Sequence, residues 1–222
     1  VFAEPYIQQF LDVAKSNAKE KFAVIPNPLS FSQYITQDEL RCKAKDVIVV
    51  GRLYEAQKRL TAVLKIWRKV ENNPLLQDWN LTLIGEGTSG DYYKWLAAKY
   101  NLKNIHFVGR QDPIPYYRRA SILLSTSAYE GWPMILMECM PMGVVPCVFN
   151  SYGAVTEIIS HKQSGMVAPE YDLNAFYQNL SQVMQDDEMR KRMAAQAIEC
   201  SRQFDVSNVG KKWHQLFEEL TK

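Results

Sequence analysis

The chain has 222 residues, of which 47% are hydrophobic and 23% charged, and these are ordinary proportions for a globular protein. Its 26 basic and 24 acidic side chains leave a net charge of +2, which argues against nucleic-acid binding because no excess of cations can cover a phosphate backbone. No apolar run approaches the roughly 18–20 residues of a membrane span. The cysteines form no CxxC pair and the histidines have no ligand at metal spacing, so we expect a reducing compartment and no metal site.

The first 45 residues differ from the rest of the chain. Residues 4–18 have the apolar spacing of an amphipathic helix, and residues 22–25 are expected to form a short strand. Pro26-Asn27-Pro28 can continue neither element and predicts a stiff turn. Residues 29–45 are polar and irregular. The N-terminal helix therefore resembles part of another unit, joined through a turn to the remainder of the protein.

From residue 46 onward, short apolar runs alternate with amphipathic segments. Unbroken apolar runs of this kind suit strands buried on both faces, as in a parallel sheet. The expected strands lie at residues 47–50, 81–84, 105–108, 122–124, 144–149 and 165–167. The expected helices lie at residues 56–70, 91–100, 113–119, 133–140, 155–160, 173–184, 188–203 and 206–220. This alternation predicts an α/β fold with a doubly wound parallel sheet, over roughly residues 46–204.

The loop after the first expected strand contains Gly51, Arg52 and Lys58. In a parallel sheet, ligands bind at the carboxyl ends of the strands, where helix N-termini offer N–H groups. The glycine allows a close turn, and the two cations could point at one anion such as a diphosphate. The alternative is a solvated basic loop that pairs with Glu55.

The loop after the second expected strand has the sequence Gly-Glu-Gly-Thr-Ser-Gly at residues 85–90, which matches G-x-G-x-x-G. With Asp112 some twenty residues further on, this pattern is typical of dinucleotide binding. The dinucleotide pattern normally follows the first strand of such a sheet, however, and here a strand and a helix precede it. Glycines that serve only a tight turn are the simpler interpretation, and NAD binding through Gly85, Gly87 and Gly90 remains the alternative.

A third loop follows residues 122–124 and contains Glu130, just before a helix that begins near Pro133. Glu138 lies inside that helix among apolar residues, where an unused charge would be costly. Two carboxylates eight residues apart could contact hydroxyl-rich groups on either side of a phosphate. Isolated glutamates are usually only solvated, so the apolar setting is what favours a functional role for Glu138.

These three loops, together with Gly143 and Glu157, resemble the retaining glycosyltransferases of family 4. The similarity is to the C-terminal, donor-binding domain of their two-domain GT-B fold, which is Rossmann-like. It runs from about residue 25 to residue 204, and the three loops occur in the order and spacing of the family. Each loop alone is weak, but their combination is specific.

The resemblance implies a role for each matching residue. Arg52 and Lys58 would neutralise the diphosphate of a nucleotide-sugar donor, and Glu138 would hold its ribose. Glu130 would contact the sugar hydroxyls beside the backbone amides of residues 131–134. The implied donor-binding residues are Gly51, Arg52, Lys58, Gly85, Gly87, Arg110, Ile114, Glu130, Gly131, Trp132, Pro133, Met134 and Glu138. Of these, Arg52, Lys58 and Glu130 would also serve catalysis.

The resemblance also implies the chemistry and the partners. Transfer would proceed with retention at the anomeric carbon, with a nucleotide sugar as co-substrate (a UDP-sugar favoured over a GDP-sugar) and with no metal or other cofactor. The acceptor would be a glycan or a lipid-linked molecule in bacterial surface-polysaccharide or lipopolysaccharide synthesis. We expect a cytoplasmic protein, with the full-length enzyme at the inner face of the membrane as a peripheral protein.

Departures from the family pattern define what this chain is expected to be. Residues 1–29 match only the end of an N-terminal domain and the hinge, residues 30–204 match the donor domain, and residues 205–222 match a helix that crosses back to the first domain. We therefore expect a fragment that binds donor without turnover and self-associates through its exposed interdomain face. Position 59 is Arg where the family often has Gly, and Tyr152-Gly153 stands where it often has two glycines.

Three other functions remain open on the sequence alone. One is an NAD-dependent oxidoreductase that uses the glycines of residues 85–90. Another is a GT-B relative with different chemistry, such as a sugar epimerase or a phosphorylase. The third is a split glycosyltransferase whose partner chain supplies the acceptor half.

Overall fold

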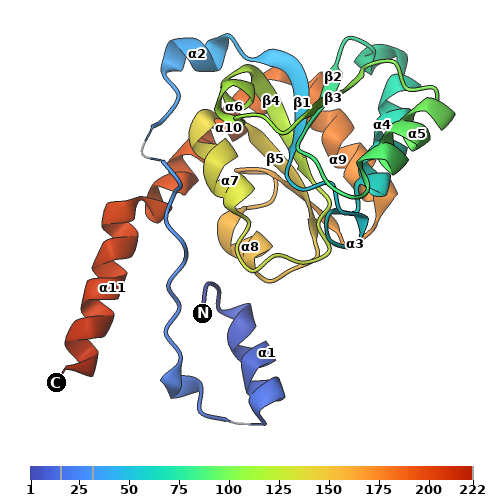
Figure 1. Cartoon of the computed structure of the whole chain (residues 1–222). Helices are drawn as coiled ribbons and strands as arrows, with labels where there is room; N and C mark the ends of the chain where they lie inside the picture. The colour runs from blue at the N-terminus through green and yellow to red at the C-terminus, as the bar shows by residue number, and fades with distance from the viewer. Residues whose placement is uncertain (16, 32, 222) are drawn as a thin grey trace.

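The computed structural model describes residues 1–15, 17–31 and 33–221. Its centre is a six-stranded parallel sheet with strand order β3-β2-β1-β4-β5-β6, which confirms the predicted doubly wound α/β fold (Figure 1). The strands are β1 (Ala44–Val50), β2 (Asn80–Ile84), β3 (Ile105–Gly109), β4 (Ala120–Ser125), β5 (Val145–Asn150) and β6 (Met166–Pro169). The strand order reverses between β1 and β4, where β1 pairs with β2 on one side and with β4 on the other.

Helices cover both faces of the sheet, as buried strands require (Figure 1). Side chains alternate along β1, so Val47 and Val49 pack into one core and Ile48 into the other. The first core includes side chains of α4 (Leu60–Glu71), α5 (Gly90–Lys99) and α9 (Leu173–Gln185). The second includes side chains of α6 (Ile114–Arg119), α7 (Met134–Cys139) and α8 (Ala154–Ile158). Helix α10 (Asp187–Ser201) contributes to both.

The predicted helix over residues 56–70 is two helices, α3 (Glu55–Lys58) and α4. Arg59 separates them with a left-handed backbone (φ 50°), a conformation that glycine adopts more easily than other residues. Thr126 follows β4, and its hydroxyl donates to the carbonyl oxygens of Lys58 and Arg59 at 2.7 and 3.2 Å, which holds the break in place. The break explains why a glycine would suit position 59.

The N-terminal region departs further from the prediction. Helix α1 (Pro5–Ala14) ends before residue 18, at a left-handed Lys15, and Ser16 lies outside the described residues. The strand predicted at residues 22–25 is wrong, because this extended segment joins no strand of the sheet; the Ile25 amide donates instead to the Val1 carbonyl at the chain start. Residues 29–45 are not wholly irregular: α2 (Gln37–Arg41) begins at a capping box. Single-turn helices lie at Lys19–Lys21, Pro74–Leu76, Met140–Met142 and Arg202–Phe204.

Helix α11 (Val206–Leu220) extends away from the sheet beside the N-terminal segment (Figure 1). A groove of about 1080 Å³ lies between the two and is lined by Phe2, Phe22, Trp213 and Leu220 among others. Trp213, Phe217 and Leu220 are exposed apolar side chains on this helix. Within the described part of the chain, no helix is long and apolar enough to cross a membrane.

Candidate functional site

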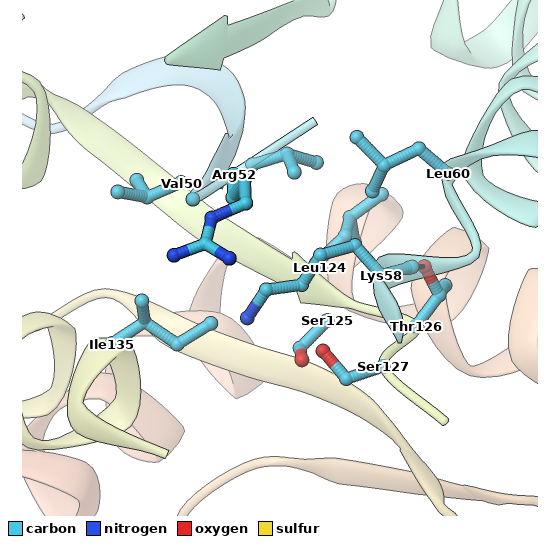
Figure 2. A pocket seen from close by; sticks show the side chains of 11 residues that line it. Val50, Arg52, Lys58, Leu60, Leu124, Ser125, Thr126, Ser127 and Ile135 are labelled. Carbon is cyan, nitrogen blue, oxygen red and sulfur yellow. Dashed lines mark hydrogen bonds between the residues drawn. The ribbon is translucent and has the colours of Figure 1, made fainter. Parts of the chain in front are cut away.

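A pocket lies at the carboxyl ends of β1 and β4, where the strand order reverses and where open parallel sheets bind ligands. It is a small hollow lined by Gly51 and Arg52 after β1, by Lys58 of α3 and by Ser125 at the end of β4 (Figure 2). An open cleft of about 820 Å³ shares Gly51 and Arg52 with the pocket and continues to Glu86 and Arg110. The pocket and the cleft are therefore adjacent at this edge of the sheet, and Arg52 lies where they meet.

Arg52 and Lys58 point into this same space (Figure 2). The Lys58 ammonium contacts the Glu130 carboxylate at 2.5 Å, and both side chains are largely buried, at 15% and 13% exposed. The Gln57 amide reaches the other carboxylate oxygen at 3.4 Å. Arg52 is exposed, and among the described residues it has no hydrogen-bond or ion-pair partner. Arg52 is therefore an unpaired cation of the pocket, whereas Lys58 is paired to a carboxylate.

Close backbone packing explains the glycines of this edge. A Cβ atom on Gly85 would lie 1.9 Å from the Gly51 carbonyl oxygen, and one on Gly87 would lie 2.5 Å from that of Leu53. Gly51 and Gly85 both have φ near +140°, which side chains disfavour. The Gly51 amide donates to the Ile84 carbonyl at 3.0 Å, and the Gly85 amide donates to Gly109 at 2.7 Å. Gly85 and Gly87 are thus needed for loop packing whether or not a dinucleotide binds.

Glu138 is not an unused charge in its apolar helix. Its carboxylate accepts hydrogen bonds from the Tyr117 hydroxyl at 2.8 Å and from the Ser30 hydroxyl at 3.2 Å. Burial and the neighbouring Glu138 charge raise the pKa of Tyr117 well above its usual value, so this tyrosine stays a hydrogen-bond donor. Glu138 lines neither the pocket nor the cleft, and its predicted contact with a ribose remains a prediction.

The residues between the two glutamates hold the loop in place. Trp132 is buried, with its ring 6.4 Å from Phe2 and 5.5 Å from Phe204, so its side chain belongs to the core. Pro133 is buried before α7, and Met134 accepts a long hydrogen bond from Asn27 at 3.7 Å. Gly131 is exposed. Their backbone amides remain the predicted contacts.

Arg110 and Ile114, predicted in one loop, are placed differently. Arg110 is exposed and lines the open cleft that Arg52 also lines. Ile114 begins α6, where its amide donates to the Asp112 carboxylate at 3.1 Å, and it does not line the cleft. The structure therefore brings Arg52, Lys58, Glu130 and Arg110 to one edge but not Ile114.

Sequence reasoning missed two contributors to this edge. One is the polar run Ser125-Thr126-Ser127, whose position directly after a buried apolar strand was visible in the sequence and could have identified it. The other is Tyr6 of α1, whose hydroxyl donates to the Glu130 carbonyl oxygen at 2.7 Å. The N-terminal segment is thus in contact with the site loop, and no local sequence pattern indicates such a long-range contact.

Among residues 1–15, 17–31 and 33–221, no three His, Cys, Asp or Glu side chains are placed to hold a metal ion. The charged groups of this site are Arg52, Arg110 and the ion pair of Lys58 with Glu130.

An open parallel sheet whose strand order reverses, with cations at the reversal point, is the architecture of a doubly wound α/β domain. The chain belongs to the glycosyl transferases group 1 family, whose model matches residues 31–199. This membership favours the glycosyltransferase interpretation over the oxidoreductase alternative.

Individual relatives agree with the family. The amylovoran biosynthesis glycosyltransferase AmsD of Erwinia amylovora is 30% identical over 176 residues, which are 78% of this chain and 48% of that protein. A second relative, from Campylobacter jejuni, is 24% identical over 202 residues, which are 90% of this chain and 55% of that protein. It is the GalNAc-alpha-(1->4)-GalNAc-alpha-(1->3)-diNAcBac-PP-undecaprenol alpha-1,4-N-acetyl-D-galactosaminyltransferase. The chain spans about half the length of these curated relatives.

Solved structures confirm the fold. A variant of TarM from S. aureus, crystallised with Fondaparinux, alpha-GlcNAc-glycerol and UDP, superposes with a TM-score of 0.85 at 19% identity. The match covers 98% of this chain and 43% of that one. The structural neighbours are GT-B glycosyltransferases, so the predicted Rossmann-like half of a GT-B fold is confirmed.

Proposed function

We propose that this chain binds a nucleoside-diphosphate sugar at the β1–β4 edge and serves as the donor half of a retaining glycosyltransferase. The observation that carries the proposal is the convergence of Arg52 and Lys58 at the reversal point of the sheet, beside Glu130. A diphosphate needs two such cations, since each charge-assisted hydrogen bond contributes about 1.5–3 kcal/mol. The UDP in the TarM crystal supports a nucleoside diphosphate as the ligand, and the choice of a uridine over a guanosine donor is part of the proposal.

The ion pair between Lys58 and Glu130 defines what happens when donor arrives. Lys58 would turn from Glu130 to the phosphate, and Glu130 would then accept hydrogen bonds from sugar hydroxyls. As the bond between the anomeric carbon and the phosphate oxygen breaks, negative charge grows on the leaving diphosphate. Arg52 and Lys58 would stabilise that charge, while the acceptor hydroxyl attacks the same face of the sugar. Transition-state stabilisation is thus assigned to the two cations.

The acceptor half lies outside this chain in the proposal. We assign residues 1–29 to the end of an N-terminal acceptor domain and its hinge, residues 30–204 to the donor domain, and residues 205–222 to the helix that returns to the first domain. The exposed apolar side chains of α11 and the groove beside it would then be covered in the whole protein. The relatives above support a glycan or lipid-linked acceptor in bacterial polysaccharide synthesis. Work on such an acceptor would place the enzyme at the inner membrane face.

Calorimetric titration with UDP, GDP, ADP and NAD, without added metal, tests donor binding directly. We expect saturable binding of one nucleoside diphosphate, with dissociation constants between about 1 μM and 1 mM. Arg52→Ala should weaken binding by about 2 kcal/mol, roughly thirtyfold, because a phosphate loses its partner. Arg41→Ala, an exposed arginine of α2 that lines neither hollow of the site, is the matched control and should leave binding unchanged. Binding of NAD alone, or equal binding by both variants, would refute the site.

A further inference from the structure

The start of the chain packs against two loops beside the site. A Cβ atom on Gly153 would lie 2.7 Å from the Pro5 Cβ, so the N-terminal segment approaches the start of α8 as closely as only glycine allows. On the other side, the Phe2 ring lies 6.4 Å from the ring of Trp132, in the loop before α7. Residues 1–6 therefore contact both α8 and the loop that contains Glu130.

Tyr6 joins this segment to the backbone of the site loop. Its half-buried hydroxyl donates to the Glu130 carbonyl oxygen at 2.7 Å. Burial raises the pKa of Tyr6, a hydrogen bond from the Ala154 amide lowers it, and the Glu130 charge raises it again. The net rise keeps this hydroxyl protonated at neutral pH. Tyr6 can therefore donate to the site loop while it accepts from the first residue of α8.

The hydrogen bond to this carbonyl also fixes the direction of the next amide. A peptide group is planar and almost always trans, so the Glu130 C=O and the Gly131 N–H point in opposite directions. Gly131 is exposed, and its amide donates no hydrogen bond to another described residue. Tyr6 therefore turns an unpaired N–H group away from α1 and leaves it available to a ligand.

Glu130 is held at two points, and a ligand would release only one of them. Its carboxylate contacts the Lys58 ammonium at 2.5 Å, and its carbonyl oxygen accepts from Tyr6. If Lys58 turns to a phosphate, the first contact is lost. The second lies on the backbone and does not compete with an anion. The Tyr6 hydrogen bond therefore remains when the ion pair opens.

We propose that Tyr6 is a positioning residue of the sugar site, whose hydroxyl holds the loop of Glu130 and Gly131 once Lys58 has turned to the diphosphate. This inference rests on the proposed function and adds a residue from the segment that we assign to the acceptor half. A sugar nucleotide would use the Glu130 carboxylate and the neighbouring amides, whereas a bare nucleoside diphosphate would use the two cations. Loss of the Tyr6 hydroxyl should therefore weaken binding of the sugar nucleotide more than binding of the nucleoside diphosphate.

Calorimetric titration of Tyr6→Phe tests this role, because the substitution keeps the ring and removes only the hydroxyl. The probes are UDP, UDP-glucose, UDP-galactose and UDP-N-acetylglucosamine, and the readout is the ratio of affinities for the sugar nucleotide and for UDP. For the sugar that the wild type prefers, Tyr6→Phe should lower this ratio at least threefold and change the UDP affinity less than twofold.

Tyr34→Phe is the matched control. The Tyr34 hydroxyl donates to the Asp205 carboxylate at 2.6 Å, and Tyr34 lines neither the pocket nor the cleft. This variant also loses one hydrogen bond of the N-terminal region, but it should keep the wild-type ratio. If both variants lower the urea midpoint and neither changes the ratio, the Tyr6 hydroxyl serves only the fold, and its positioning role is refuted.

The remaining outcomes separate this inference from the proposed function. If neither UDP nor its sugars bind to the wild type, the proposed function fails and the role of Tyr6 fails with it. If they bind and Tyr6→Phe keeps the wild-type ratio, only the role of Tyr6 is refuted. An equal loss of UDP and UDP-sugar affinity would show general damage to the site, and an equal drop of the ratio in Tyr34→Phe would show general loosening of the N-terminal region. Either result would also refute it.

Discussion

The ion pair between Lys58 and Glu130 gives the sharpest test of the site, because it ties stability to ligand binding. The perturbation is Lys58→Met, which keeps the length of the side chain but removes its charge. Among the described residues, the largely buried Glu130 carboxylate would then keep only the long contact from Gln57 at 3.4 Å. A largely buried charge without a partner destabilises the folded state more than the same pair does when both charges are removed.

The magnitude follows from the geometry of the pair. Two unit charges 2.5 Å apart attract by about 7 kcal/mol at an effective dielectric constant of about 20. Desolvation of both groups offsets most of this attraction, so removing one partner of a fully buried pair costs about 3–5 kcal/mol. With about one seventh of each side chain exposed, we expect Lys58→Met to cost about 2–3 kcal/mol. The double variant Lys58→Met/Glu130→Gln should return to within about 1 kcal/mol of wild type.

The assay is a double-mutant cycle of urea unfolding, followed by UDP titration of the same four proteins. Stability should recover in the double variant, whereas UDP binding should be lost in both proteins that lack Lys58. If the two single variants simply add, or if the double variant recovers UDP binding, Lys58 has no role as a phosphate ligand released from Glu130.

Other parts of the molecule make independent predictions. Gly85→Ala should lower the free energy of unfolding by more than about 3 kcal/mol or prevent folding, because the new Cβ would lie 1.9 Å from the Gly51 oxygen. Gly210→Ala on α11 is the control and should leave stability unchanged or raise it. Urea unfolding followed by circular dichroism compares the two variants. Arg59→Gly should change stability by less than about 1 kcal/mol, because relief of the left-handed backbone offsets loss of the ion pair with Glu170. Burial lowers the pKa of Lys43 to about 7 from 10.5. Between these values the unfolded chain holds a proton that the folded chain has released, so stability should rise with pH by up to about 1.4 kcal/mol per pH unit, and Lys43→Met should flatten this rise in urea titrations at pH 7 to 10. A slope that is equally steep in Lys43→Met would contradict this assignment.

The sheet was predictable because its strands carry a strong local pattern. Runs such as residues 47–50 and 81–84 are apolar on both faces, and only a strand covered by helices on both sides can bury them. The sequence also predicted that Arg52, Lys58 and Glu130 lie at one edge of the sheet, because the carboxyl ends of parallel strands all lie at the same edge. This property of parallel sheets was enough to group the three residues without knowledge of their contacts.

The features that the sequence did not predict depend on contacts between residues far apart in the chain. The break at Arg59 is held by the hydroxyl of Thr126, which follows β4, so the apolar spacing of residues 56–70 could not reveal it. The contact between Tyr6 and the Glu130 carbonyl joins residues 124 positions apart. The expected strand at residues 22–25 failed for the same reason, because apolar alternation does not show that the sheet has no place for it.

The charges of the site have a consequence for specificity. Lys58 is neutralised by Glu130, so a ligand must bring enough negative charge to compete with that carboxylate, which disfavours neutral sugars. Arg52 has no such competitor among the described residues and can contact a phosphate directly. A diphosphate can therefore open the ion pair whereas a free sugar cannot, so a nucleotide sugar should bind where its free sugar does not.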